Sequence, residues 1–73
     1  MSEEAKAVWQ WINSMKMKSG DYVDFRAFNA WCANSHLANA GDFIPVLDEL
    51  VRLGILVDKN EPDAEKTWNY WVA

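Results

Sequence analysis

The sequence contains few of the residues on which catalytic and metal sites depend. Its 73 residues include one cysteine, one histidine and three glycines. A single cysteine excludes a disulfide within the chain, and one His, one Cys and scattered carboxylates do not make a set of zinc ligands. Ser19-Gly20-Asp21 lacks the glycine spacing and the lysine of a phosphate-binding loop. We therefore expect no enzymatic activity, no metal site and no small-molecule cofactor.

Cys32 and His36 are the only pair that resembles a nucleophile and its base. Their spacing of four residues would bring them together only if one helix continued through Asn34-Ser35, which that composition disfavours. We expect Cys32 to be a buried apolar residue in a reducing compartment, and His36 to be a surface or capping residue. Neighbouring carboxylates such as Asp48 and Glu49 point about 100° apart on a helix, so they cannot share a substrate proton.

The chain also lacks a long hydrophobic run and an excess of basic residues. No apolar stretch approaches the ~18 residues that a membrane span needs, and Met1-Ser2-Glu3-Glu4 carries acid where a signal peptide carries base. We therefore expect a cytoplasmic protein that does not bind a membrane. Eleven acidic residues against seven basic ones give a net charge of −4. This balance disfavours duplex DNA as a partner, because the phosphate backbone attracts basic surfaces.

Apolar and aromatic side chains are abundant. Hydrophobic residues make up 51% of the sequence, and five of its residues are tryptophan. A domain of this size buries only about 60% of the surface that its unfolded chain exposes, so large aromatic side chains are needed to fill its core. We find no internal repeat and no linker. The sequence predicts a single domain over residues 1–73.

Three segments have helical periodicity. The first helix is predicted over Glu3–Met15 with Ser2 as N-cap, the second over Asp24–Ala33 with Asp24 as N-cap, and the third over Phe43–Leu53 with Asp42 as N-cap. Pro45 fits the first turn of the third helix, and Gly54 is placed to end it. The residues expected on the three buried faces are, in order, Ala5, Val8, Trp9, Ile12 and Met15, then Phe25, Phe28, Trp31 and Cys32, then Phe43, Val46, Leu47, Leu50 and Leu53.

After Gly54 the apolar period changes to two. This change predicts strands over Ile55–Val57 and Trp68–Val72, with Thr67 as a further candidate residue, which pair antiparallel across a long polar connection. Asp21-Tyr22-Val23 is prone to β structure but too short for an independent strand. The predicted fold class is α+β and mostly helical, a three-helix core followed by a C-terminal β-hairpin.

The order of helix, short strand, helix, helix and hairpin resembles that of the winged-helix superfamily. The run from Val46 to Val57 looks like the third helix of that superfamily leading into its wing, and nearly the whole chain fits. The resemblance implies a nucleic-acid-binding ancestry, in which the third helix enters the major groove and the wing lies on the backbone.

The charges depart from this resemblance on both elements that should contact DNA. The outward face of the third helix is expected to carry Ile44, Pro45, Asp48, Glu49 and Arg52, without Lys, Asn or Gln to contact base edges. Acidic residues also outnumber basic ones around the hairpin tip, where Asp58, Glu61, Asp63 and Glu65 accompany Lys59 and Lys66. A protein partner is therefore favoured over DNA.

Two tryptophans complete the predicted contact surface. Alternation along the last strand places Trp71 on the face opposite to Trp68 and Tyr70, and Trp11 falls just outside the apolar stripe of the first helix. Partly exposed Trp is a common anchor of protein interfaces. The predicted partner-binding residues are Ile44, Pro45, Asp48, Glu49, Arg52, Trp71 and Trp11.

Three functions remain open from the sequence. The leading one is a protein-binding winged helix, by analogy a small phage or mobile-element product that engages or inhibits a host transcription, replication or defence protein. The second is a DNA-binding transcriptional or replication regulator whose contacts come from Lys6, Lys16, Lys18 and Arg26. The third is a DNA mimic with carboxylates in place of phosphates. Its acidic face would need Asp42, Asp48, Glu49, Asp58, Glu61, Asp63 and Glu65 on one side.

Overall fold

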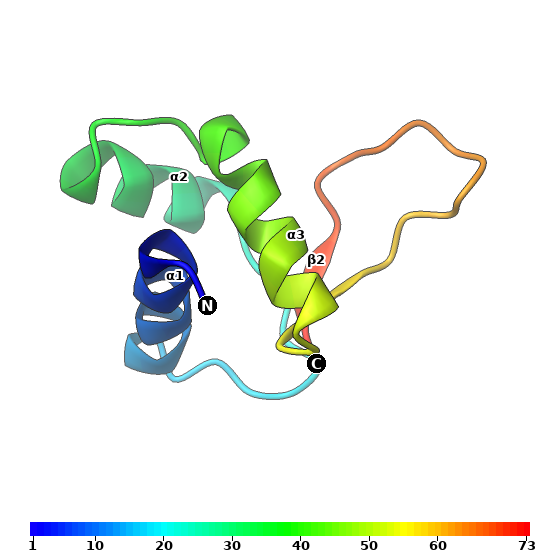
Figure 1. Cartoon of the computed structure of the whole chain (residues 1–73), viewed down its shortest axis with the longest axis horizontal. Coiled ribbons are helices and arrows are strands. Elements are labelled where there is room, and N and C mark those ends of the chain that lie inside the picture. Colours follow the sequence, from blue (N-terminus) through cyan, green and yellow to red (C-terminus); the bar gives the residue numbers. More distant parts are fainter.

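The computed structural model describes residues 1–73 and has three helices followed by a two-stranded antiparallel sheet (Figure 1). The elements are α1 (Glu3–Ser14), α2 (Phe25–Ser35), a short 3₁₀ helix η1 (Ala40–Phe43), α3 (Ile44–Arg52), β1 (Leu56–Asp58) and β2 (Tyr70–Val72). The predicted class, α+β and mostly helical with a C-terminal hairpin, is confirmed. No helix is long and apolar enough to cross a membrane.

Both predicted caps of the first two helices are present. The Ser2 hydroxyl accepts a hydrogen bond from the Ala5 amide at 3.1 Å, and the Asp24 carboxylate accepts one from the Ala27 amide at 2.9 Å. These side chains satisfy amides that a helix start leaves without a partner. The second helix continues to Ser35, two residues beyond the predicted end, so Asn and Ser in its last turn did not stop it.

The predicted cap of the third helix is wrong. Asp42 lies within η1, where its carboxylate accepts from the backbone amide of Asn39 at 3.1 Å, and Asn39 is the residue before that element. The α-helix itself begins only at Ile44, with Pro45 in its first turn. Its end follows the prediction, because Gly54 takes a positive φ of 78° and the Ile55 amide donates to the Leu50 carbonyl at 2.9 Å.

A third extended segment joins the hairpin. β1 and β2 pair antiparallel with Val57 opposite Trp71. β1 has the predicted length but begins one residue later than predicted, and β2 lacks the first two predicted residues, Trp68 and Asn69. Tyr22 forms a β-bridge with Trp71 on the other side of β2. Hydrogen bonds from the Val23 amide to the Tyr70 carbonyl, at 2.9 Å, and from the Val72 amide to the Asp21 carbonyl, at 2.8 Å, flank this bridge. The residues between α1 and α2 therefore extend the sheet.

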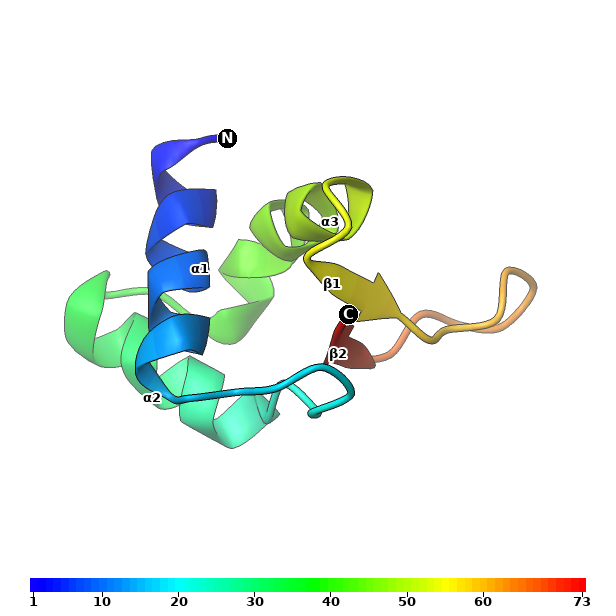
Figure 2. The ribbon, with the colours of Figure 1, turned by 90° about the horizontal axis from the view of Figure 1, so that it is seen from below.

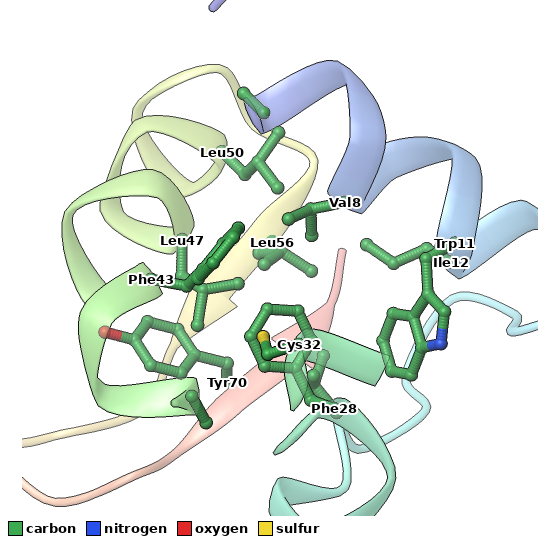
Figure 3. Packing of buried hydrophobic residues seen from close by; sticks show 13 residues of the cluster. Val8, Trp11, Ile12, Phe28, Cys32, Phe43, Leu47, Leu50, Leu56 and Tyr70 are labelled. Atoms are coloured by element: carbon green, nitrogen blue, oxygen red, sulfur yellow. The ribbon is translucent and has the colours of Figure 1, made fainter. Parts of the chain in front are cut away.

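The core lies where the three helices meet the inner face of this sheet (Figure 3). Phe28 is fully buried near its centre, with ring centroids 5.3 Å from Trp11, 5.8 Å from Phe43 and 5.6 Å from Trp68. The Trp68 indole also donates to a backbone carbonyl, that of Val23, at 2.8 Å. One aromatic cluster thus connects α1, α2, η1 and the segment that leads into β2.

Several predicted burials are wrong. Trp11 is buried, with 8% of its surface exposed, whereas Trp9 is 44% exposed. The reason is that α2 packs on the Trp11 side of α1, where Trp11 contacts Phe28 and Trp31. Three further residues expected in the core are exposed instead, namely Met15, Phe25 and Leu53.

Candidate interaction surface

The outward face of α3 presents fewer free groups than its sequence indicates. Pro45 and Arg52 are exposed, and Ile44 is half-buried. Asp48 and Glu49 are also only half-exposed, because both carboxylates accept hydrogen bonds from other parts of the chain. The two acidic residues predicted to contact a partner therefore also stabilise the fold.

Asp48 ties α3 to the hairpin. Its Oδ1 accepts from the Tyr70 hydroxyl at 3.0 Å and from Lys66 Nζ at 3.0 Å, and Lys66 also lies 3.6 Å from Asp58. The hydrogen bond to Asp48 raises the pKa of Lys66 above its ordinary value. Burial, with the bond to Asp48, raises the pKa of Tyr70. Lys66 is thus shared between two carboxylates and is not a free cation.

Glu49 ties α3 to the start of α1. Its two carboxylate oxygens accept from the Ser2 amide and the Ser2 hydroxyl, each at 2.9 Å. These two bonds from Ser2 lower the pKa of Glu49, so this group stays ionised at neutral pH. Glu49 therefore adds negative charge to the face of α3 while its orientation is fixed.

The connection between the strands projects away from the helices in both views (Figures 1 and 2). Its neck is closed by Asn60, whose Oδ1 accepts from the Thr67 backbone amide at 3.0 Å and whose backbone amide donates to the Asp58 carboxylate at 2.9 Å. Beyond this neck, Glu61, Asp63 and Glu65 are exposed and form no ion pair. We call these three residues the acidic tip.

The outer face of the sheet carries an aromatic patch, which we define as Tyr22, Val57 and Trp71. Tyr22 and Trp71 face each other across two strands with ring centroids 5.0 Å apart, as expected for a bridge pair without its own hydrogen bonds. Val57, on β1, lies directly opposite Trp71 on the other side of β2. Tyr22 is 38% exposed and Val57 39% exposed. Trp71, between them, is half-buried, so the patch is a continuous apolar strip that is partly exposed on the outside of the sheet.

Two polar side chains fix the orientation of Trp71 within the aromatic patch. The Asn69 side-chain oxygen accepts from the Trp71 indole at 2.7 Å. Lys59 Nζ lies 4.0 Å from the centroid of the indole ring, in cation–π geometry. The ring thus has an ordered position and already contacts a positive charge.

The predicted contact residues lie in different environments in the structure. Trp11 lies in the core, so its predicted exposure is wrong, whereas Trp71 lies on the outer face, as alternation predicts. The sequence prediction missed Tyr22, Val57 and Lys59. The β-prone run before Asp24 was the only available signal for Tyr22, because its pairing with Trp71 joins segments that are far apart in the sequence.

Cys32 and His36 do not form a pair for chemistry. Cys32 is buried, and burial, with the nearby charge of Asp42, raises the pKa of its thiol. His36 is exposed and packs against the rings of Trp31 and Phe43, at centroid distances of 4.7 Å and 5.2 Å. The structure has no group of three His, Cys, Asp or Glu side chains arranged to hold a metal ion.

Comparison with protein-family models, with curated proteins and with solved structures finds no match for this chain. We therefore infer its function from the surface alone.

Proposed function

We propose that this protein is a non-enzymatic interaction module of winged-helix type that binds another protein and does not bind duplex DNA. The architecture supports the winged-helix part of this proposal. The helices and strands follow each other in the expected order, and the segment before α2 joins the two-stranded hairpin through the Tyr22 bridge.

The observation that carries the proposal is the partly exposed aromatic patch on the outer face of the sheet. Tyr22 and Trp71 contact each other there with their ring planes tilted by 55°, and Tyr22 is 38% exposed, whereas rings such as those of Phe28 and Trp11 pack in the core. Protein interfaces are enriched in Tyr and Trp, and exposed contiguous apolar surface marks interaction sites. The patch offers such an anchor beside the polar side chains of Lys59 and Asn69.

The charges oppose duplex DNA. The outward face of α3 carries Asp48 and Glu49 as fixed negative groups, and the acidic tip adds three more carboxylates on the hairpin. Arg52 is the only basic side chain of α3. Phosphate contacts supply most of the affinity of non-specific DNA binding, and neither element provides them.

The two other functions gain less support. A DNA mimic needs a continuous row of free carboxylates, yet Asp48 and Asp58 share Lys66, and Glu49 is bonded to Ser2. A DNA-binding regulator would depend on the exposed side chains of Lys6, Lys16, Lys18 and Arg26, all of which lie outside α3 and the hairpin.

Fluorescence anisotropy with a labelled duplex at ~150 mM salt tests the proposal. We expect no saturable binding at protein concentrations up to about 100 µM, the weak end of ordinary non-specific affinity. Changing the acidic tip to lysine (Glu61→Lys, Asp63→Lys, Glu65→Lys) should create salt-sensitive DNA binding, because these side chains have no partner to lose. Asp48 and Glu49 are unsuitable for charge reversal, since both support the fold. Tight binding by the native chain, or no gain on reversal of the tip, would contradict the proposal.

A further inference from the structure

We propose that the aromatic patch and the acidic tip together bind a basic segment of the protein partner, with an arginine of that segment lying on the ring of Trp71. This inference rests on the proposed protein-binding function and names the chemistry of the partner.

A cation already lies on the ring that the partner would use. Lys59 Nζ is 4.0 Å from the centroid of Trp71, and Tyr22 supports the same indole from the neighbouring strand. A positive charge near an aromatic face is stabilised by the ring quadrupole, most strongly with tryptophan. Lys59 is an exposed side chain on a flexible stem, so a guanidinium from a partner can take its place.

The charges around the aromatic patch complement a basic segment. Lys66 is neutralised by Asp48 and Asp58, so Lys59 is the one cation of the hairpin without an ion pair. The acidic tip, by contrast, has three carboxylates without an ion pair. When Lys59 is displaced from the ring, the three carboxylates of the acidic tip are still available to pair with basic side chains of the partner.

Arginine fits this combination better than other side chains. A guanidinium stacks on an indole through its flat face and donates in a fork to a carboxylate through its edge. The aromatic patch would hold one arginine of the basic segment through its flat face, and the acidic tip would pair with further basic side chains of the same segment. A second copy of this chain is a poorer occupant, because two acidic tips and two molecules of net charge −4 repel each other.

Isothermal titration of the full chain with an octa-arginine peptide at ~150 mM salt tests the inference, with octa-glutamate as the peptide control. We expect octa-arginine to bind and octa-glutamate not to bind. Lys59→Ala should tighten octa-arginine binding about three-fold or more, because it frees the ring and removes a repulsive charge. Lys6→Ala on α1 removes the same charge elsewhere and is the matched control, for which we expect a smaller change.

Aromatic variants test the ring itself. Trp71→Leu should weaken octa-arginine binding about five-fold or more, whereas Trp9→Leu, at an exposed tryptophan of α1, should leave it unchanged. Tyr22→Leu is the second variant, for use if thermal melting shows that Trp71→Leu does not fold. Neutralising the acidic tip (Glu61→Gln, Asp63→Asn, Glu65→Gln) should weaken binding by a similar factor.

The inference is overturned if octa-glutamate binds more tightly than octa-arginine, or if sedimentation shows that the free chain self-associates through Trp71. It is also overturned if Lys59→Ala behaves like Lys6→Ala while both aromatic variants retain full affinity, because bulk charge would then explain the binding. None of these results shows whether the chain binds duplex DNA. The anisotropy experiment tests that point, so a failure of the proposed function can be distinguished from a failure of this inference.

Discussion

The inner and outer faces of the sheet both carry aromatic side chains, but they use them differently. On the inner face, Tyr70 is 1% exposed and its ring contacts Trp68, which precedes β2 and packs against Phe28. On the outer face, Tyr22 and Trp71 contact each other, and Tyr22 is 38% exposed while Trp71 is half-buried. The inner rings stabilise the fold because they remove apolar surface from water. The outer rings keep part of their apolar surface in water and therefore stabilise the fold less. We interpret the outer face as surface kept for a partner.

The largest expected effect falls on the inner cluster. Phe28→Ala removes the ring that connects α1, η1 and Trp68, and it should cost about 3–5 kcal/mol of unfolding free energy. Total stabilities of small domains are about 5–15 kcal/mol, so this variant should melt far below the parent chain or not fold. A melting temperature within a few degrees of the parent would contradict the assignment of Phe28 to the core.

A pair of leucines on α3 sharpens the contrast between buried and open positions. Leu50 is fully buried and Leu53 is 51% exposed, although both fit the same helical stripe. Leu50→Ala should cost about 2–5 kcal/mol, whereas Leu53→Ala should cost less than about 1 kcal/mol. Urea unfolding of the two variants measures both values. Equal losses would mean that the buried face of α3 is assigned wrongly.

The two tyrosine hydroxyls allow a similar comparison. Tyr70→Phe removes a buried hydroxyl that donates to Asp48, and it should cost about 1–2 kcal/mol in chemical denaturation. Tyr22→Phe is the control, because the Tyr22 hydroxyl has no hydrogen-bond partner within the chain, and we expect almost no change. A larger loss for Tyr22→Phe than for Tyr70→Phe would refute the contrast between the two faces.

Trp71→Leu should cost less than about 1 kcal/mol, because a cross-strand pair on an open sheet face contributes little to stability. Thermal melting of this variant beside Phe28→Ala compares the outer face with the inner one directly. If Trp71→Leu destabilises the chain as much as Phe28→Ala does, the outer rings are structural and our interpretation of the aromatic patch fails.

The smallest expected effect concerns pH and the contact between α1 and α3. Since Ser2 lowers the pKa of Glu49, the folded chain binds fewer protons there than the unfolded chain, and this contribution is lost as pH falls below about 4.5. Glu49→Gln should therefore lose less melting temperature than the parent between about pH 7 and about pH 3. Glu61→Gln, at an exposed residue without an ion pair, should behave like the parent. Equal acid sensitivity of all three chains would exclude this role for Glu49.

Local sequence signals predicted the parts of the fold that depend on nearby residues. Ser2, Asp24 and Gly54 each act within one helical turn, and each was assigned correctly. Trp9 and Trp11 show where such signals end. Both flank the same apolar stripe, and only the packing of α2 against one side of α1 determines which of them is buried.

The aromatic patch was only half predictable for the same reason. Alternation along β2 placed Trp71 opposite to Tyr70, but nothing in the local sequence joined Tyr22 to it across about fifty residues. The hydrogen bonds of the Asp48 and Glu49 carboxylates were not predicted, because their partners, Lys66 and Ser2, lie 18 and 47 residues away in the sequence. Because of these long-range contacts, the candidate site in the structure lies on the sheet, whereas the sequence predicted it mainly on α3.

Chemical-shift mapping with octa-arginine is the most direct test of our central claim that the outer face of the sheet is the contact surface. The five tryptophan indole protons are separate probes, two on α1, one on α2, one just before β2 and one on β2. We predict that the signal of the Trp71 indole proton shifts most, together with the backbone amide signals of Tyr22, Val57 and the acidic tip. The indole signals of Trp9 and Trp11 should not shift. Shifts centred on α3, or spread evenly over the molecule, would contradict it.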